Sequence, residues 1–232
     1  DLILVEGPKL LEEALRSNLE VKAVASDDST IHAAHLVAPS FLFSAPLMKS
    51  LSDVETHQGI VALVGRPRYK NEWLNAKETF ALVLDGLQDP GNVGTLFRTA
   101  EAAGVSGVLL TRGCADPLSP KALRASAGSA FRLPHVTDLS VDQMLALLAP
   151  RIALVASVAT PGALSLFGDT SLSLPLALAL GSEGSGLDAR IERAAAHRLR
   201  IPGARRIESL NVAAAGAIAM FEIARRAGIL RS

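Results

Sequence analysis

Residues 85–98 (DGLQDPGNVGTLFR) bring an amide, Asn92, and a guanidinium, Arg98, into one turn-forming segment. An arginine near such a turn can bind an anion, and Gly94 permits another backbone to approach closely. The Asn92 side chain can cap a helix by accepting a hydrogen bond from a free backbone N–H. A helix cap followed by a surface arginine explains both residues without any function, so this alternative stays open here.

A second segment, residues 181–186 (GSEGSG), follows the apolar run LPLALAL. Three glycines after a buried strand suggest a backbone that wraps around a ligand. The segment lacks the Gly-Lys-Ser/Thr of a P-loop, and its spacing is GxxGxG rather than the GxGxxG of dinucleotide-binding folds. We expect the Glu183 carboxylate either to cap the helix near Asp188 or to face the ligand.

The third segment is residues 201–212 (IPGARRIESLNV). Ser209 and Asn211 bring a hydroxyl and an amide to the start of the last helix, where backbone N–H groups lack partners. One capping residue would satisfy that helix. Two of them beside Arg205 and Arg206 exceed what capping requires.

The elements that must position these segments alternate between strand and helix from residue 79 onward. Short apolar runs predict strands, and the segments between them predict helices; the expected strands are 80–84, 107–110, 152–156, 176–180 and 199–201, and the expected helices are 92–103, one from Pro120, 141–148 and 211–226. Such alternation predicts an α/β fold with a mostly parallel sheet and helices on both faces. Ligands bind beyond the carboxyl ends of such strands, where the three segments would meet.

Residues 1–65 show a different pattern of helix and strand signals and predict a smaller unit. Pro8 suits the first position of a helix, and residues 21–25, 41–43 and 60–64 read as strands. Residues 66–78 are polar and basic, which is typical of a linker. We therefore expect three parts: a front domain at 1–65, a linker at 66–78 and a main domain at 79–232.

Composition excludes several classes of protein. The chain has 232 residues, 49% of them hydrophobic, and equal numbers of basic and acidic residues, so any nucleic-acid surface must be local. No apolar run reaches the roughly 18 residues of a membrane helix. The single cysteine fits a reducing, cytoplasmic location, and the five scattered histidines argue against a metal site.

Together and in this order, the three segments resemble the SpoU (TrmH) family of RNA 2′-O-ribose methyltransferases, part of the SPOUT superfamily. The matching motifs are Asn92-Val93-Gly94-Thr95-Leu96-Phe97-Arg98, Gly181-Ser182-Glu183-Gly184, and Ile201-Pro202 with Ser209-Leu210-Asn211-Val212; SPKALRASAGSAFRLP resembles the middle segment of the family. Ala213 stands where the family often has serine. Residues 203–206 (GARR) replace a Met-x-Gly loop, which we expect to alter substrate choice.

The resemblance implies a C-terminal deep trefoil knot, with which the alanine-rich run NVAAAGAIA is compatible, and a homodimer. Residues 1–65 are similar to the L30e-type RNA-binding domain that precedes the catalytic domain in some members, through VEGPKLLEEAL and HQGIVAL. Related chains often start with a further helix, so we expect the natural N-terminus to lie before Asp1.

The resemblance also implies S-adenosylmethionine as the cofactor and a ribose 2′-OH of RNA as the methyl acceptor. It implies that Gly181, Glu183, Ile201, Leu210 and Asn211 hold the cofactor, and that Arg98 acts on the 2′-OH with support from Asn92, Glu183, Ser209 and Asn211. We expect RNA phosphates to contact a basic set: Arg124, Arg132, Arg205 and Arg206. No metal is needed, because the cofactor already carries an activated methyl group.

Arginine has a pKa of about 12.5 or more, so a neutral arginine acting as a base is costly. We therefore hypothesise that Arg98 clamps phosphate and stabilises developing alkoxide charge. Ribosomal RNA is the expected substrate, by analogy with the front domain. The same chemistry on transfer RNA and a non-catalytic RNA-binding protein with this fold remain alternatives. A Rossmann-like nucleotide enzyme would need an early glycine loop with an acidic residue about 20 positions on, and the chain offers none.

Overall fold

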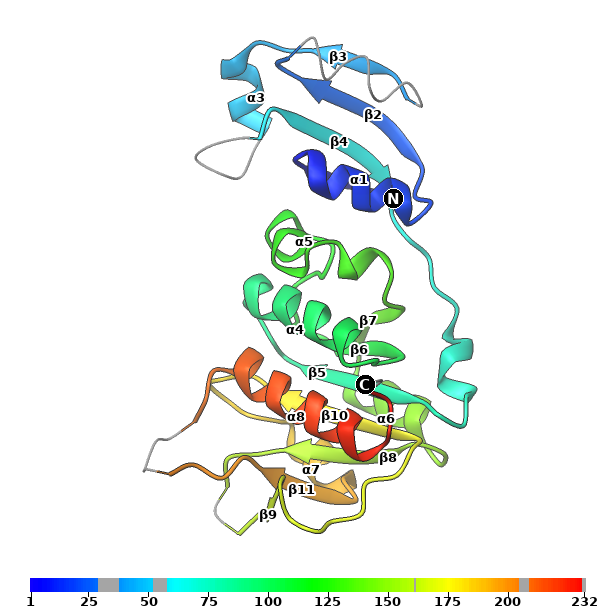
Figure 1. Cartoon of the computed structure of the whole chain (residues 1–232), viewed down its shortest axis with the longest axis vertical. Helices are drawn as coiled ribbons and strands as arrows, with labels where there is room; N and C mark the ends of the chain where they lie inside the picture. The colour runs from blue at the N-terminus through cyan, green and yellow to red at the C-terminus, as the bar shows by residue number, and fades with distance from the viewer. Residues whose placement is uncertain (29–37, 52–57, 161, 205–208, 231–232) are drawn as a thin grey trace.

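The computed structural model describes residues 1–28, 38–51, 58–160, 162–204 and 209–230. The chain forms two sheets: one contains the strands between Leu2 and Gly65, and the other contains the strands from Phe80 onward. Figure 1 shows the first sheet above the second, with helices α1 and α5 between them.

The first sheet has four strands in the order β1-β4-β2-β3. Its elements are β1 (Leu2–Glu6), α1 (Pro8–Arg16), β2 (Val21–Ser26), β3 (Ser40–Leu42), α3 (Ala45–Leu51) and β4 (Ile60–Gly65). β4 runs antiparallel to both β1 and β2, and β2 pairs in parallel with β3. The expected strands and helices of the front unit are confirmed, and β1 is an element that the sequence reasoning missed.

The second sheet has seven strands in the order β7-β6-β5-β10-β8-β11-β9, and every recorded pairing in it is parallel. Its strands are β5 (Phe80–Asp85), β6 (Gly107–Thr111), β7 (His135–Leu139), β8 (Ala153–Ser157), β9 (Leu164–Ser165), β10 (Leu176–Gly181) and β11 (His197–Arg200). Its helices are α4 (Pro90–Ala102), α5 (Pro120–Ser126), α6 (Val141–Leu148), α7 (Ala189–Ala194) and α8 (Val212–Arg226). The expectation of a parallel α/β sheet is confirmed.

Helices cover both faces of this sheet because successive side chains of its central strands point to opposite faces and are buried on both. Leu82 and Leu84 of β5 belong to the core that contains α4, α5 and α8. Ala81 and Val83 belong to a second core with Met144 of α6 and others from α7. Strands buried on both sides read as continuous apolar runs, which is why β5 and β10 were visible in the sequence.

Two glycines set how closely the helices pack. A Cβ at Gly94 of α4 would lie 2.3 Å from the carbonyl oxygen of Ala122, so α5 can approach only a glycine there. A Cβ at Gly216 of α8 would lie 2.4 Å from Leu96 and 2.7 Å from Leu180. The close approach expected at Gly94 is therefore confirmed, and α8 packs tightly on α4 and β10.

The segment between the two sheets is held along its length. Arg66 forms a two-pronged ion pair with Asp116, with nitrogen–oxygen distances of 2.8 and 2.9 Å. The Tyr69 hydroxyl donates to the carbonyl of Ala130 at 2.9 Å. Trp73, in a short 3₁₀ helix (Asn71–Asn75), packs against Gly107. These contacts fix the path of residues 66–75 over the elements of the second sheet.

Within the described part of the chain, no helix is both long and apolar enough to span a bilayer. The same residues contain no group of three or more histidine, cysteine, aspartate or glutamate side chains that could hold a metal ion.

Candidate active site

The carboxyl edge of the second sheet brings the three polar segments together. β5 and β10 are neighbours, and their last residues, Asp85 and Gly181, pair in register. The first segment continues from β5 into α4, and the second follows β10 directly. The third leads from β11 into α8, which packs against α4.

The centre of this edge is a hydrogen-bonded group of three side chains, Asn92, Glu183 and Asn211, which we call the amide cluster. Oε1 of Glu183 accepts from Nδ2 of Asn211 at 2.7 Å and from Nδ2 of Asn92 at 3.2 Å. Nδ2 of Asn211 also lies 3.3 Å from Oδ1 of Asn92. The structure therefore joins one predicted residue from each segment, although Asn92 and Asn211 are 119 positions apart.

Asp89, rather than Asn92, caps α4, so the capping expectation for Asn92 was wrong. Oδ1 of Asp89 accepts from the backbone N–H of Asn92 at 2.9 Å. Pro90 takes the first helical position, where a missing N–H costs nothing, and this makes Asp89 the cap, three residues before Asn92. The Asn92 side chain is thereby free to reach Glu183.

Asn211 caps α8 as expected and also serves the cluster. Its Oδ1 accepts from the backbone N–H groups of Ala213 and Ala214 at 3.0 and 3.3 Å. Its Nδ2 is left to donate to Glu183. One amide therefore fixes the start of α8 and the position of the carboxylate.

Glu183 does not cap the following helix, which corrects one of its two expected roles. Asp188 caps α7 itself, because its Oδ1 accepts from the backbone N–H of Arg190 at 2.8 Å. Hydrogen bonds from Arg190 lower the pKa of Asp188 to about 2, which keeps this carboxylate ionised near neutral pH.

Arg98 and Ser209 lie outside the amide cluster. Arg98 is exposed on α4, and in the described part of the chain its guanidinium has no recorded ion pair. Ser209 is exposed next to residues 205–208, which lie outside the described residues. Both side chains thus remain open to solvent.

The glycine-rich segment folds back on its own start. Ser182 and Gly186 exchange backbone hydrogen bonds of 3.1 and 2.9 Å. A Cβ at Gly181 would lie 2.2 Å from the carbonyl carbon of Gly186, so only glycine fits. A Cβ at Gly184 or Gly186 would meet no atom within 4 Å, which leaves this side of the loop uncovered.

The third segment contributes apolar side chains at the same edge of the sheet. Leu210 is 37% exposed, and Ile201 is half-buried at the end of β11. Open peptide groups beside apolar side chains and a carboxylate suit a ligand with an aromatic ring and a positive charge.

Two of the four arginines expected to contact RNA form ion pairs between the two sheets' units. Nη1 of Arg124 lies 2.7 Å from a carboxylate oxygen of Glu6, whose side chain is 5% exposed. Arg132 joins Glu101 of α4, at 2.6 Å, to Glu13 of α1. We call the Arg124–Glu6 and Arg132–Glu13 contacts the interdomain ion pairs. Arg205 and Arg206 lie outside the described residues.

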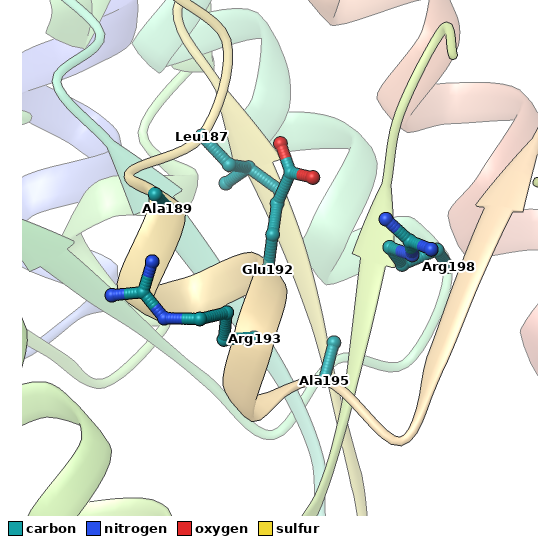
Figure 2. Close-up of a pocket in the computed structure, with 6 residues that line it drawn as sticks. All are labelled: Leu187, Ala189, Glu192, Arg193, Ala195 and Arg198. Atoms are coloured by element: carbon teal, nitrogen blue, oxygen red, sulfur yellow. The ribbon is translucent and has the colours of Figure 1, made fainter.

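A cavity of about 490 Å³ lies on the α7 face of the sheet, away from the amide cluster. Figure 2 shows Leu187, Glu192, Arg193 and Arg198 around it. It contains none of the residues predicted from the sequence. Among the residues that line this cavity, only Leu187, which directly follows the glycine-rich segment, lies near the carboxyl edge.

Asp85 and Thr111 are polar residues at this edge that the sequence reasoning missed. Both are buried at strand ends, and the Thr111 hydroxyl donates to Asp85 at 2.7 Å. An aspartate that ends a run of buried apolar residues was the available signal, since a buried carboxylate must have partners.

Comparison with known proteins gives a consistent result. Residues 79–221 match the model of the SpoU rRNA methylase family. The chain is 34% identical to an uncharacterised tRNA/rRNA methyltransferase of Synechocystis, covering 97% of this chain and 84% of that protein. It is also 34% identical to the Bacillus subtilis 23S rRNA guanosine-2′-O-methyltransferase RlmP, over 95% of this chain and 87% of the relative.

Solved structures agree with these relatives. The AdoMet-bound rRNA methyltransferase from Sinorhizobium meliloti superposes with a TM-score of 0.86 at 29% identity, covering 99% of this chain and 88% of that one. The likeness therefore extends over both sheets.

Proposed function

Because the chain belongs to the SpoU rRNA methylase family, we infer that it is an S-adenosylmethionine-dependent methyltransferase acting on ribose 2′-OH groups of ribosomal RNA. The amide cluster is the observation that carries this inference. Glu183, Asn92 and Asn211 come from three separate motifs, and hydrogen bonds join all three side chains.

Transfer of a labelled methyl group tests this function. Purified protein, labelled S-adenosylmethionine, and total ribosomal or transfer RNA from cells that lack the gene should yield label in ribosomal RNA at a 2′-O position. Label in transfer RNA alone would overturn the substrate class. Absence of label from both, together with no calorimetric binding of S-adenosylmethionine, would favour a non-catalytic RNA-binding protein.

The residues at the carboxyl edge fit the cofactor. S-adenosylmethionine supplies an activated methyl group on a sulfonium when bound. The uncovered backbone at Gly184 and Gly186 can meet its polar groups, and exposed Leu210 can pack on its apolar parts. Glu183 provides a negative charge near a cationic ligand. We propose that Gly181, Ile201 and Asn211 complete this site.

We propose that Arg98 binds a phosphate of the RNA and stabilises negative charge on the 2′-oxygen as its proton leaves. A guanidinium remains charged at neutral pH, so it acts as an electrostatic clamp rather than as a base. Its exposure and its lack of a recorded ion pair in the described residues leave it available to RNA. Asn92 and Ser209 would orient the ribose and Arg98.

The charge of Glu183 is central to this proposal. Its recorded donors are two neutral amides and the backbone N–H of Val212, at 3.4 Å. No lysine or arginine among the described residues forms an ion pair with it. A negative charge that no described guanidinium or ammonium cancels can attract a cationic cofactor.

We propose that the front domain, residues 1–65, holds the RNA through an L30e-like surface, and that Arg205 and Arg206 contact phosphate. Arg124 and Arg132 can do so only through the parts of their side chains that the interdomain ion pairs leave exposed. RNA affinity should fall as salt rises, and insensitivity to salt would rule out the phosphate contacts.

We further propose a homodimer and, from the family likeness, a deep trefoil knot after β10. Ile218 and Phe221 of α8 are 37% and 41% exposed, and such apolar side chains on one helix suit a contact between two copies. Sedimentation of the purified chain at twice the monomer mass supports the dimer, and a monomer at micromolar concentration contradicts it.

A further inference from the structure

Asp85 ends β5 at the foot of the glycine-rich segment, and its side chain is buried. One carboxylate oxygen, Oδ2, accepts from the backbone N–H of Asp188 at 2.7 Å. The other, Oδ1, accepts from the Thr111 hydroxyl at 2.7 Å. The Asp85 side chain therefore links the ends of β5 and β6 to Asp188, which follows the glycine-rich segment.

The donors around Asp85 require a carboxylate rather than an amide. The Thr111 hydroxyl accepts from the backbone N–H of Gly86 at 3.1 Å, so its own hydrogen is directed to Asp85. The N–H of Asp188 is a fixed donor. An asparagine at position 85 would turn an NH₂ group towards one of these donors and leave a buried polar group without a partner.

Two contacts with β5, one at Gly181 and one at Asp188, close the glycine-rich segment into a loop. Gly181 is held opposite Asp85 by the strand pairing, and Asp188 is held by the carboxylate of the same residue. Glu183 lies between these two points and bonds to Asn92 and Asn211. The position of Glu183 thus depends on how the loop is closed.

We propose that Asp85 is a positioning residue for methyl transfer, which closes the glycine-rich loop through Asp188 and so keeps Glu183 in place for S-adenosylmethionine. This inference rests on the proposed function. Asp85 touches no reacting atom; it acts by preorganising the loop, which lowers the cost of binding a ligand there.

Substitutions in the full-length protein separate positioning from general stability. Asp85→Asn keeps the shape and removes one acceptor, Thr111→Val keeps the shape and removes the hydroxyl, and Thr111→Ser restores the hydroxyl. Thr79→Val is the matched control, because it removes a buried hydroxyl that donates to the carbonyls of Trp73 and Ala76 at the amino end of β5, the opposite edge of the sheet from Asp85. The measurements are calorimetric affinity for S-adenosylmethionine, RNA affinity, Tm, and hydrogen exchange of amides 182–188.

Asp85→Asn should weaken binding of S-adenosylmethionine by roughly tenfold, the effect of one unpaired buried polar group. It should speed exchange of amides 182–188 and change RNA affinity less than about twofold. Thr111→Val should shift both loop measurements in the same direction, and Thr111→Ser should match the wild type. Thr79→Val should lower Tm without changing cofactor affinity.

The proposal is overturned if folded Asp85→Asn binds the cofactor within twofold of the wild type, or if Thr79→Val weakens binding as much as Asp85→Asn does. Should Asp85→Asn fail to fold, the contrast between Thr111→Val and Thr111→Ser decides, and equal affinities for those two variants reject the proposal. Failure of the wild-type protein itself to bind S-adenosylmethionine overturns the proposed function instead, and the positioning role with it.

Discussion

The amide cluster and the interdomain ion pairs both use glutamates to join segments that are far apart in the chain. In the interdomain pairs, Glu6 and Glu13 meet guanidinium groups, so positive and negative charges cancel. In the amide cluster, Glu183 meets neutral amides, which hold it without cancelling its charge. The first arrangement suits a scaffold, whereas the second keeps a charge available for chemistry.

The largest expected effect is a loss of methyl-transfer rate at Arg98, which contrasts with the loss of stability expected at Arg124. Arg98→Ala should lower the rate of methyl transfer by about 100- to 1,000-fold, the loss typical of a group that stabilises developing charge, and leave Tm unchanged. Arg98→Lys should recover only part of the rate, since ammonium lacks the two-pronged geometry. Rate measurements at saturating RNA and cofactor check this, and full activity of the lysine variant would contradict the clamp.

Arg124→Ala should have the opposite profile, with a loss of stability and a small change in rate. It leaves the buried Glu6 carboxylate without its guanidinium, and we expect unfolding to become easier by about 2 kcal/mol. Tm should fall by roughly 4–8 °C in a chain of this size. Adding Glu6→Gln should restore part of the stability, and purely additive losses would show that the pair is not coupled.

The Arg132–Glu101 pair, which shares its guanidinium with the Arg132–Glu13 interdomain pair, should also respond to acid. Burial, the largest single influence, raises the pKa of Glu101, but the hydrogen bonds from Arg132 and Ser129 together with the charge of Arg132 outweigh it, so the pKa lies below its ordinary value. This pair therefore contributes its full stability above the unfolded-state pKa of about 4.3 and loses it as pH falls through the lower folded value. Arg132→Gln should flatten the decline in urea-unfolding stability below about pH 4.3, and an unchanged slope would contradict the assignment.

The smallest effect is expected at the exposed pair between Arg66 and Asp116. Their side chains are 35% and 43% exposed, so water and salt screen the attraction. Arg66→Gln should change the free energy of unfolding by about 0.5 kcal/mol or less. A loss as large as that of Arg124→Ala would show that burial of Glu6 is not what distinguishes the interdomain pairs.

The sequence predicted those features that depend on local pattern. The apolar runs at β5 and β10 and the glycines between residues 181 and 186 located the carboxyl edge. β7 was missed because it is a half-exposed edge strand whose residues, HVTDL, lack a continuous apolar run. β1 was missed although its core residues Ile3 and Val5 are buried, since its partner strand lies about 60 residues away.

The parts of the site that depend on distant partners could not be predicted. Arg124 and Arg132 looked like RNA contacts, because nothing local indicates that Glu6 and Glu13 lie beside them. The hydrogen bonds of Asp85 likewise appear only when β6 and the glycine-rich loop are in place. The cap of α4 is a different case, because it is local: Pro90 suits the first helical position, so the sequence already favoured Asp89 over Asn92 as the cap.

The most direct test of the account is the methyl-transfer rate of Glu183→Gln. All three recorded hydrogen bonds to Glu183 are accepted by Oε1, so glutamine can keep them while removing the negative charge. We predict an unchanged Tm and a rate to ribosomal RNA at least tenfold below the wild type, since loss of one charge in such a site costs about 1.4 kcal/mol or more. A wild-type rate would contradict the account, because the amide cluster would then be a scaffold like the interdomain ion pairs.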